Sequence, residues 1–104
     1  GPGGEPLTAV VCSNDATAVT LFGYLQAEGR RVPGEIAVTG YGNLLPDYLD
    51  ALALTTVAQP FEEVGRVAAE VLLRRLSQRA AAPDCWQIEL PVRLIVRSSS
   101  AAPA

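Results

Sequence analysis

The chain has 104 residues, of which 49% are hydrophobic, and a formal net charge of −3 at pH 7. All eight basic residues are arginines, and there is no lysine or histidine. A mildly acidic chain with dispersed arginines lacks the basic patch of a nucleic-acid-binding domain, and without histidine it cannot build a Ser-His or Cys-His nucleophile pair. A domain of this size buries about two-thirds of its unfolded surface, so the excess of apolar residues predicts faces intended for another lobe or subunit.

The cysteines and the apolar runs limit the classes of protein further. Cys12 lies in an apolar segment and Cys85 in a polar loop, a spacing that fits neither a metal nor a redox motif. Two free thiols and a disulfide are both open, although free thiols in a reducing cytoplasm are the simpler interpretation. No apolar run reaches the roughly 18 residues that cross a bilayer, and no signal-peptide pattern opens the chain. We therefore expect a cytoplasmic protein without a membrane partner.

The first part of the chain reads as a strand followed by a helix. Residues 9–12 are an apolar run without alternation, which suits a parallel strand that is covered on both faces. Ser13 or Asn14 can cap a helix over residues 16–28, and Gly29 fits the left-handed conformation that ends it.

The middle of the chain reads as two further short strands. Pro33 keeps the preceding turn out of the helix, and residues 36–39 form a second buried strand. Residues 44–52 read as a loop, and residues 54–57, rich in β-branched side chains, as a third strand.

A second helix is predicted over residues 60–76. Pro60 suits a first helical turn, and Glu62 and Glu63 lie beside the positive end of the helix dipole. These two carboxylates are more simply a dipole complement than an acid/base pair. Three arginines lie near the negative end of the helix dipole: Arg74, Arg75 and Arg79. They are more simply explained as a complement to the dipole than as a track that binds phosphates. One face carries apolar residues at helical spacing: Val64, Val67, Ala68, Val71, Leu72 and Leu76.

The end of the chain reads as a loop, a strand and a tail. Residues 80–84 are loop-like; Trp86, Ile88 and Leu90 alternate as a strand would, and the strand continues through residues 93–97. Small residues from Ser98 onward predict a frayed terminus. Together the elements predict an α/β fold with a mainly parallel sheet and flanking helices.

Polar residues follow the first two strands. Asn14 and Asp15 come after the first strand, and Tyr41, Gly42 and Asn43 after the second. Ligands of open α/β sheets bind beyond the carboxyl ends of the strands, where amides and carboxylates can recognise a sugar or another polar molecule. The alternative is structural, with Asn14 and Asp15 as a helix cap and Gly42 as a turn that needs positive φ.

Four motifs occur in a fixed order and spacing: Ser-Asn-Asp at 13–15, Gly-Tyr-Gly-Asn at 40–43, Leu-Thr-Thr-Val-Ala-Gln-Pro at 54–60 and Leu-Ile-Val-Arg-Ser at 94–98. Together they resemble the C-terminal part of the effector-binding domain of LacI/GalR (lactose-repressor) transcription regulators, which has a type I periplasmic-binding-protein-like fold. The resemblance implies that residues 8–98 sense a small-molecule effector and dimerise, while a DNA-binding headpiece lies outside the chain. Residues 1–7 are then a linker and residues 99–104 a flexible tail.

The resemblance also implies which residues act. The ligand-binding positions are Asn14, Asp15, Gly42, Gln59 and Phe61. The family usually has an effector-binding aspartate where this chain has Gly42, so either the effector differs or Asn43 or a residue outside the chain replaces the contact. Phe61 either stacks on a ligand ring or staples the start of its helix.

The same resemblance implies a homo-oligomer with Val19, Phe22 and Leu45 at the subunit interface. It implies no enzyme activity, cofactor or metal, and the chain has no glycine-rich phosphate loop or metal-ligand spacing. DNA would be bound only through the headpiece, so the chain alone should show no specific DNA binding. One alternative is a fragment of a periplasmic sugar-binding protein, which shares the fold and the Asn-Asp pair. Another is a fragment of a flavodoxin-like enzyme, which would need a bound cofactor that no motif in the chain indicates.

Overall fold

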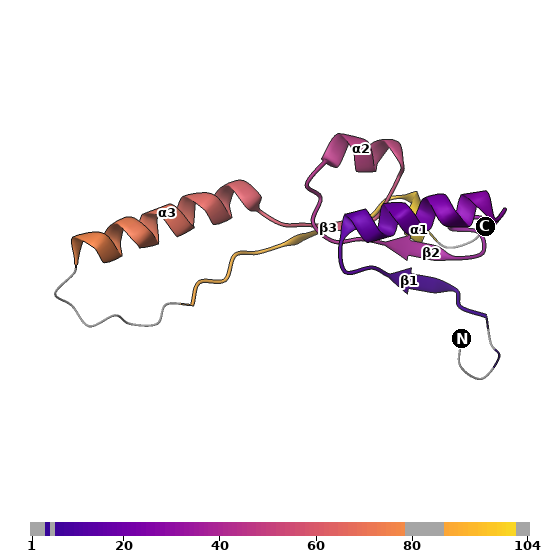
Figure 1. Cartoon of the computed structure of the whole chain (residues 1–104), viewed down its shortest axis with the longest axis horizontal. Helices are drawn as coiled ribbons and strands as arrows, with labels where there is room; N and C mark the ends of the chain where they lie inside the picture. The colour runs from indigo at the N-terminus through magenta and orange to yellow at the C-terminus, as the bar shows by residue number, and fades with distance from the viewer. Residues whose placement is uncertain (1–3, 5, 79–86, 102–104) are drawn as a thin grey trace. The chain divides into compact units, whose positions relative to one another are not determined.

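The computed structural model describes Gly4 and residues 6–78 and 87–101, and its contacts divide the chain into two units (Figure 1). The sheet unit comprises residues 1–59 and 93–104, and the helical unit residues 60–92. The elements in chain order are β1 (Ala9–Val11), α1 (Asp15–Ala27), β2 (Ala37–Thr39), α2 (Pro46–Ala51), β3 (Thr56–Ala58), α3 (Phe61–Ser77), β4 (Arg93–Ile95) and the 3₁₀ helix η1 (Ser98–Ser100).

The strands of the sheet unit lie in the order β1-β2-β3-β4. β1 pairs in parallel with β2, with Val10 opposite Val38. Two parallel bridges, Thr39 to Thr55 and Gly42 to Ala58, place β3 beside β2, and β4 pairs with β3 in the antiparallel direction. The predicted α/β fold with a mainly parallel sheet is therefore confirmed, with β4 as an antiparallel edge strand.

A small core holds the sheet unit together. Its buried apolar side chains come from α1, β2, α2 and the segments that follow β1 and precede β3: Cys12, Ala18, Leu25, Val38, Leu49 and Leu54. Cys12 carries a free thiol, and burial raises the pKa of that thiol. Cys85 lies outside the described residues.

Both predicted helices are present within about one residue of their expected ends. Asn14 caps α1, and Gly29 follows its end with φ of +74°. α3 carries Glu62 and Glu63 in its first turn and Arg74 and Arg75 in its last, as the helix dipole favours. α1 is thus defined by its cap and its terminal glycine, and α3 by its apolar periodicity and the charges at its ends.

The prediction of a loop over residues 44–52 is wrong, because this segment contains α2. Pro46 stands at the start of the helix and Asp47 in its first turn. Leu49 is only 2% exposed and belongs to the core. A helix of six residues is too short to show a periodic pattern, and it depends on this one buried side chain.

Two predictions for the end of the chain are also wrong. No strand occurs in the described residues 87–92, and β4 is limited to Arg93–Ile95 because its partner β3 has only three residues before Gln59 and Pro60. Trp86 lies outside the described residues. The terminus is not frayed at Ser98–Ser100, where Ser99 is 2% exposed and hydrogen-bonded within the sheet unit.

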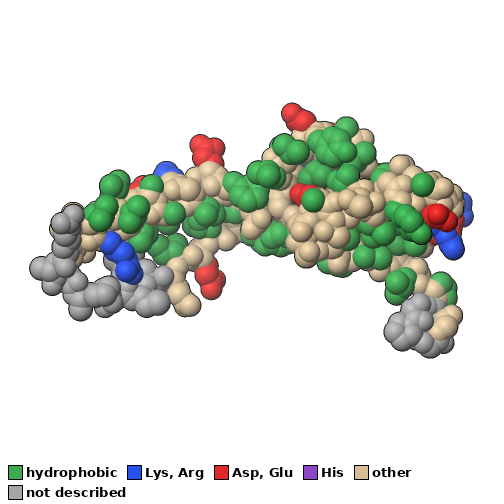
Figure 2. Space-filling view, in the orientation of Figure 1, with side chains coloured by type: hydrophobic (Ala, Val, Ile, Leu, Met, Phe, Trp, Pro, Cys, Tyr) green, Lys and Arg blue, Asp and Glu red, His purple; other side chains and the backbone are tan. Residues whose placement is uncertain are grey.

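The chain leaves much apolar surface uncovered (Figure 2). β1 was expected to be covered on both faces, but Val11 is 82% exposed. α3 has no buried residue, and its exposed apolar side chains include Val64, Leu72, Leu73 and Leu76. Because α3 is amphipathic, it has a face suited to packing that the helical unit itself does not cover.

Candidate functional site

One carboxylate joins the ends of the parallel strands. Asp15 is the first residue of α1, in the connection that follows β1, and its backbone N–H donates to Tyr41 O at 3.1 Å. Asp15 Oδ2 accepts a hydrogen bond from Asn43 N at 2.6 Å, and Oδ1 accepts one from Thr56 Oγ1 at 2.6 Å. The segments after β1 and β2 therefore meet β3 at a single half-buried side chain.

Two glycines allow this close approach. A Cβ on Gly40 would collide with Asp15 Oδ1. Gly42 has φ of +131°, a conformation that L side chains rarely adopt, and its N–H donates to Val57 O at 2.7 Å. The turn interpretation of Gly42 is therefore correct. An aspartate at position 42, which the family usually has, would be strained in this backbone conformation.

Asn14 acts as the helix cap. Its side-chain oxygen accepts a hydrogen bond from Thr17 N at 2.8 Å. This role uses only the carbonyl oxygen, so the side-chain amide nitrogen is not needed for the cap. The cap and a ligand contact are thus compatible roles for Asn14.

Asn43 holds a buried acceptor without a partner. Its backbone has φ of +60°, which asparagine tolerates better than most residues. Its Oδ1 is buried and meets no hydrogen-bond donor among the described residues. An unsatisfied buried acceptor costs about 1–3 kcal/mol, so this atom is suited to a donor from outside the chain.

The two remaining predicted ligand positions fall in different units. Gln59 follows β3 in the sheet unit, and its N–H donates to Gly42 O at 3.1 Å. Its side-chain oxygen lies 3.9 Å from the position that a Cβ on Gly42 would take. Phe61 belongs to the helical unit, where it begins α3 and is 44% exposed. Of the five predicted residues, the structure brings Asp15, Gly42 and Gln59 together, with Asn14 adjacent in sequence.

Thr56 and Gly40 both lie in the motifs that indicate the family, but neither was predicted to be a site residue. Thr56 is fully buried and bonded to Asp15. A hydroxyl at the start of a buried strand, in a motif that follows a glycine-rich turn, was the available signal.

An apolar hollow of about 350 Å³ lies between α1 and the segment containing α2. Its lining residues are Asp15, Ala16, Val19, Leu44, Leu45, Tyr48 and Leu49. Of the three predicted interface residues, Val19 and Leu45 line this hollow, and Phe22 is a half-buried residue of α1 that does not. Leu44, Leu45 and Tyr48 are each more than half exposed.

Within the described part of the chain, no group of three or more histidine, cysteine, aspartate or glutamate side chains could hold a metal ion. No helix in the described ranges is long and apolar enough to span a membrane.

The model of the periplasmic binding protein-like domain matches residues 2–100 of this chain. The HTH-type transcriptional repressor PurR of Vibrio atlanticus is 45% identical over 76 residues, which are 72% of this chain and 22% of the relative. The HTH-type transcriptional regulator YvdE of Bacillus subtilis is 36% identical over 92 residues, which are 88% of this chain and 28% of the relative. The chain thus spans less than a third of either protein.

Solved structures show the same relationship. The complex of the transcriptional regulator CelR with cellobiose has a TM-score of 0.77 at 33% identity, over 89% of this chain and 28% of that one. A dimeric Lac repressor has a TM-score of 0.77 at 32% identity, over 93% of this chain and 35% of that one. The matched domain, the regulator relatives and the sugar-bound and dimeric neighbours agree with one another, and the chain belongs to the LacI family of transcriptional regulators, as the C-terminal part of their periplasmic-binding-protein-like domain.

Proposed function

We propose that this chain is the effector-sensing and self-associating portion of a cytoplasmic transcription regulator. It binds a small polar, sugar-like ligand and controls DNA binding by a headpiece outside this chain. The names of PurR and YvdE support regulation over periplasmic sugar transport. Sequencing the gene upstream of this segment tests the proposal. A helix-turn-helix there would support regulation, and a signal peptide would contradict it.

The observation that carries the ligand proposal is the meeting of polar groups beyond the carboxyl ends of β1 and β2, beside β3. Asp15 is bonded to Asn43 and Thr56 at this edge, and Gln59 follows β3 beside Gly42. An edge of this kind is where α/β sheets bind small molecules. CelR, one of the similar structures, holds cellobiose.

The groups at this edge favour a neutral, hydroxyl-rich ligand. The amide nitrogen of Asn14 and the side chain of Gln59 supply donors and acceptors. Each oxygen of Asp15 has a second lone pair beyond its bond to Asn43 or Thr56, so it can still accept a ligand hydroxyl. Because Gly42 contributes no carboxylate, amides take a larger share of recognition than in relatives with an aspartate there.

The test separates the cap from the ligand contact at Asn14. Asn14→Ser keeps a capping oxygen but removes the amide nitrogen, whereas Asn14→Ala removes both. Titration of the full-length regulator with a panel of sugars, beginning with cellobiose, identifies the effector. We expect Asn14→Ser to retain thermal stability and to lose the response to that effector. An Asn14→Ser variant that responds like the parent would show that Asn14 is a cap only.

We propose in addition that the hollow between α1 and α2 receives a second copy of the chain. Leu45 is 63% exposed beside Val19, and apolar surface of this kind is typical of an interface. Phe22 contributes from the same helix as Val19. The dimeric Lac repressor supports this assembly.

Sedimentation equilibrium of the chain tests the interface. Leu45→Glu should convert a dimer to a monomer because it buries a charge. Leu94→Glu, at a β4 residue that is 62% exposed, is the matched control and should leave the dimer intact. Equal association of the two variants would place the interface elsewhere.

A further inference from the structure

The last described residues hold the end of α2 in place. We call residues 97–100 the C-terminal clasp. Ser99 is buried, and its hydroxyl donates to Val38 O at 2.6 Å and accepts from Thr55 N at 2.8 Å. The Ser99 N–H donates to Ala53 O at 2.9 Å. The clasp therefore contacts β2, the residue before β3 and the turn that follows α2.

That turn has a defined geometry. The N–H of Leu54 donates to Leu49 O and the N–H of Ala53 donates to Asp50 O, each at 3.0 Å. With Ala53 at φ of +56°, these bonds form a Schellman motif that ends α2, and its Leu49 and Leu54 side chains are both buried in the core. The carbonyls of Ala53 and Leu54 are left to accept bonds from other segments.

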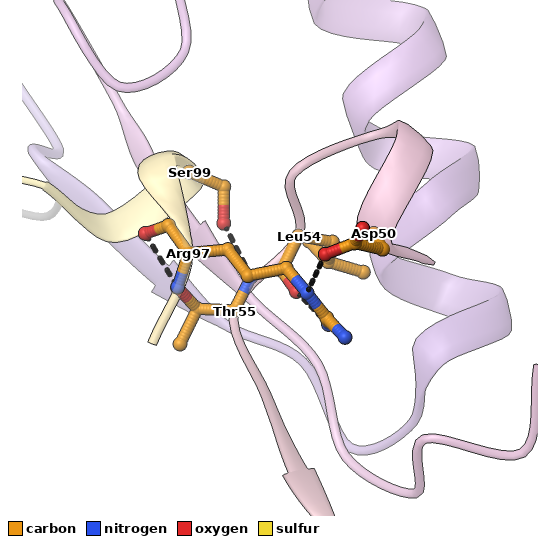
Figure 3. A network of polar contacts seen from close by, with 5 residues as sticks. All are labelled: Asp50, Leu54, Thr55, Arg97 and Ser99. Atoms are coloured by element: carbon orange, nitrogen blue, oxygen red, sulfur yellow. Dashed lines mark hydrogen bonds and ion pairs between the residues drawn. The ribbon is translucent and has the colours of Figure 1, made fainter. Parts of the chain in front are cut away.

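The Arg97 side chain contacts both this turn and α2 (Figure 3). Its Nη1 donates to Leu54 O at 2.7 Å, and its Nε lies 3.4 Å from Asp50 Oδ1 on α2. The Arg97 side chain is 11% exposed, whereas that of Asp50 is 79% exposed. The bond to the carbonyl is therefore the stronger anchor, because solvent weakens the ion pair.

Thr55 fixes the backbone of Arg97. Thr55 Oγ1 accepts from Arg97 N at 2.8 Å and contacts the Ser100 hydroxyl. The next residue, Thr56, bonds instead to Asp15 at the candidate ligand site. Thr55, directly before β3, thus holds the clasp, and Thr56, the first residue of β3, holds the polar edge of the sheet, since successive side chains of extended backbone point to opposite sides.

We propose that Arg97 is a positioning residue for α2, and hence for the apolar surface of Leu44, Leu45 and Tyr48 that receives the second copy. The proposal rests on the proposed self-association. β4 ends two residues before Arg97, and β4 is the strand by which the chain re-enters the sheet unit from residues 60–92. Arg97 therefore connects β4 to α2 and to the apolar surface beside it.

The experiment compares Arg97→Ala, Arg97→Lys and the control Arg93→Ala, which removes the same charge from an exposed β4 residue. Amide hydrogen exchange at Leu49 and Leu52 reports on α2, exchange at Val38 reports on the sheet, and sedimentation equilibrium gives the dissociation constant of the dimer. We expect Arg97→Ala to speed exchange in α2 and to weaken the dimer, each by about tenfold or more, the effect of losing one charge-assisted hydrogen bond. Arg97→Lys should lie between the two alanine variants, because an ammonium group cannot reproduce both guanidinium contacts.

Two results overturn the proposal. In the first, α2 exchange and dimer affinity in both Arg97 variants match the Arg93→Ala control. In the second, Val38 exchange rises as much as that of Leu49 in both Arg97 variants, which would show that Arg97 supports the whole sheet unit rather than α2. An unsubstituted chain that stays monomeric contradicts the proposed interface alone, and the exchange rates then still decide whether Arg97 positions α2.

Discussion

The sheet unit and the helical unit are stabilised in different ways. The sheet unit buries six apolar side chains drawn from segments far apart in the sequence and connects them with buried polar contacts. α3 in the helical unit has charges that complement its dipole and ion pairs from Arg66 to Glu63 and Glu70, but none of its residues is buried. Local signals are enough to define a helix, whereas a stable unit also needs side chains that leave water. The apolar face of α3 thus resembles an element made to pack against another surface.

The largest difference should appear on removing a leucine side chain from each unit. Leu54→Ala takes a side chain that is 1% exposed out of the core and should cost about 2–5 kcal/mol of unfolding free energy. Leu73→Ala, at an α3 residue that is 65% exposed, should change it by less than about 0.5 kcal/mol, since alanine is also a good helix former. Urea denaturation measures both. A cost for Leu73→Ala close to that for Leu54→Ala would mean that α3 is packed in solution.

A second comparison concerns polar contacts. Asp15→Ala leaves Asn43 N and Thr56 Oγ1 without their acceptor and should cost about 2–3 kcal/mol. Arg66→Ala removes two exposed ion pairs of α3, to Glu63 and Glu70, and should have a far smaller effect. Thermal unfolding of the two variants checks this order. If Arg66→Ala were the more damaging, long-range polar contacts would not be what distinguishes the sheet unit.

A smaller effect is expected at the turn after α2. Ala53 adopts φ of +56°, where glycine has no Cβ penalty. Ala53→Gly should therefore raise the unfolding free energy by up to about 1 kcal/mol, reduced by the greater freedom of glycine in the unfolded chain. Denaturant midpoints give the sign. A destabilised variant would show that the left-handed turn carries no strain.

The smallest expected effect comes from an exposed pair inside the sheet unit. Hydrogen bonds from Arg30 and Arg31 lower the pKa of Glu35. A carboxyl whose pKa is lowered by folding stabilises the folded state above its unfolded pKa, near 4.3, and this contribution is lost as the pH falls through the folded value. Glu35→Gln should thus be slightly less stable than the parent at pH 7 and equal to it near pH 2. A stability difference that persists at low pH would contradict the assignment.

Many features of the fold could be predicted from the sequence. Asn14 and Gly29 mark the two ends of α1, and helical spacing of apolar residues and the charges at both ends define α3. The strand-ending motifs led to the LacI family and to the edge where Asp15, Gly42 and Gln59 gather. Each of these signals is contained in a short window, because capping, periodicity and turn chemistry act between near neighbours.

Other features were decided only by the tertiary structure. α2 exists because Leu49 reaches the core, and nothing within its six residues announces that burial. Thr56 binds Asp15 across 41 positions, and Ser99 binds Val38 across 61. Such partners are chosen by strand order and register, which bring distant residues together only when the chain has folded. The sequence by itself thus determined α1, α3, the first three strands and the family, and the packing of the elements decided α2, the extent of β4 and which polar residues became the candidate site, the clasp and the turn.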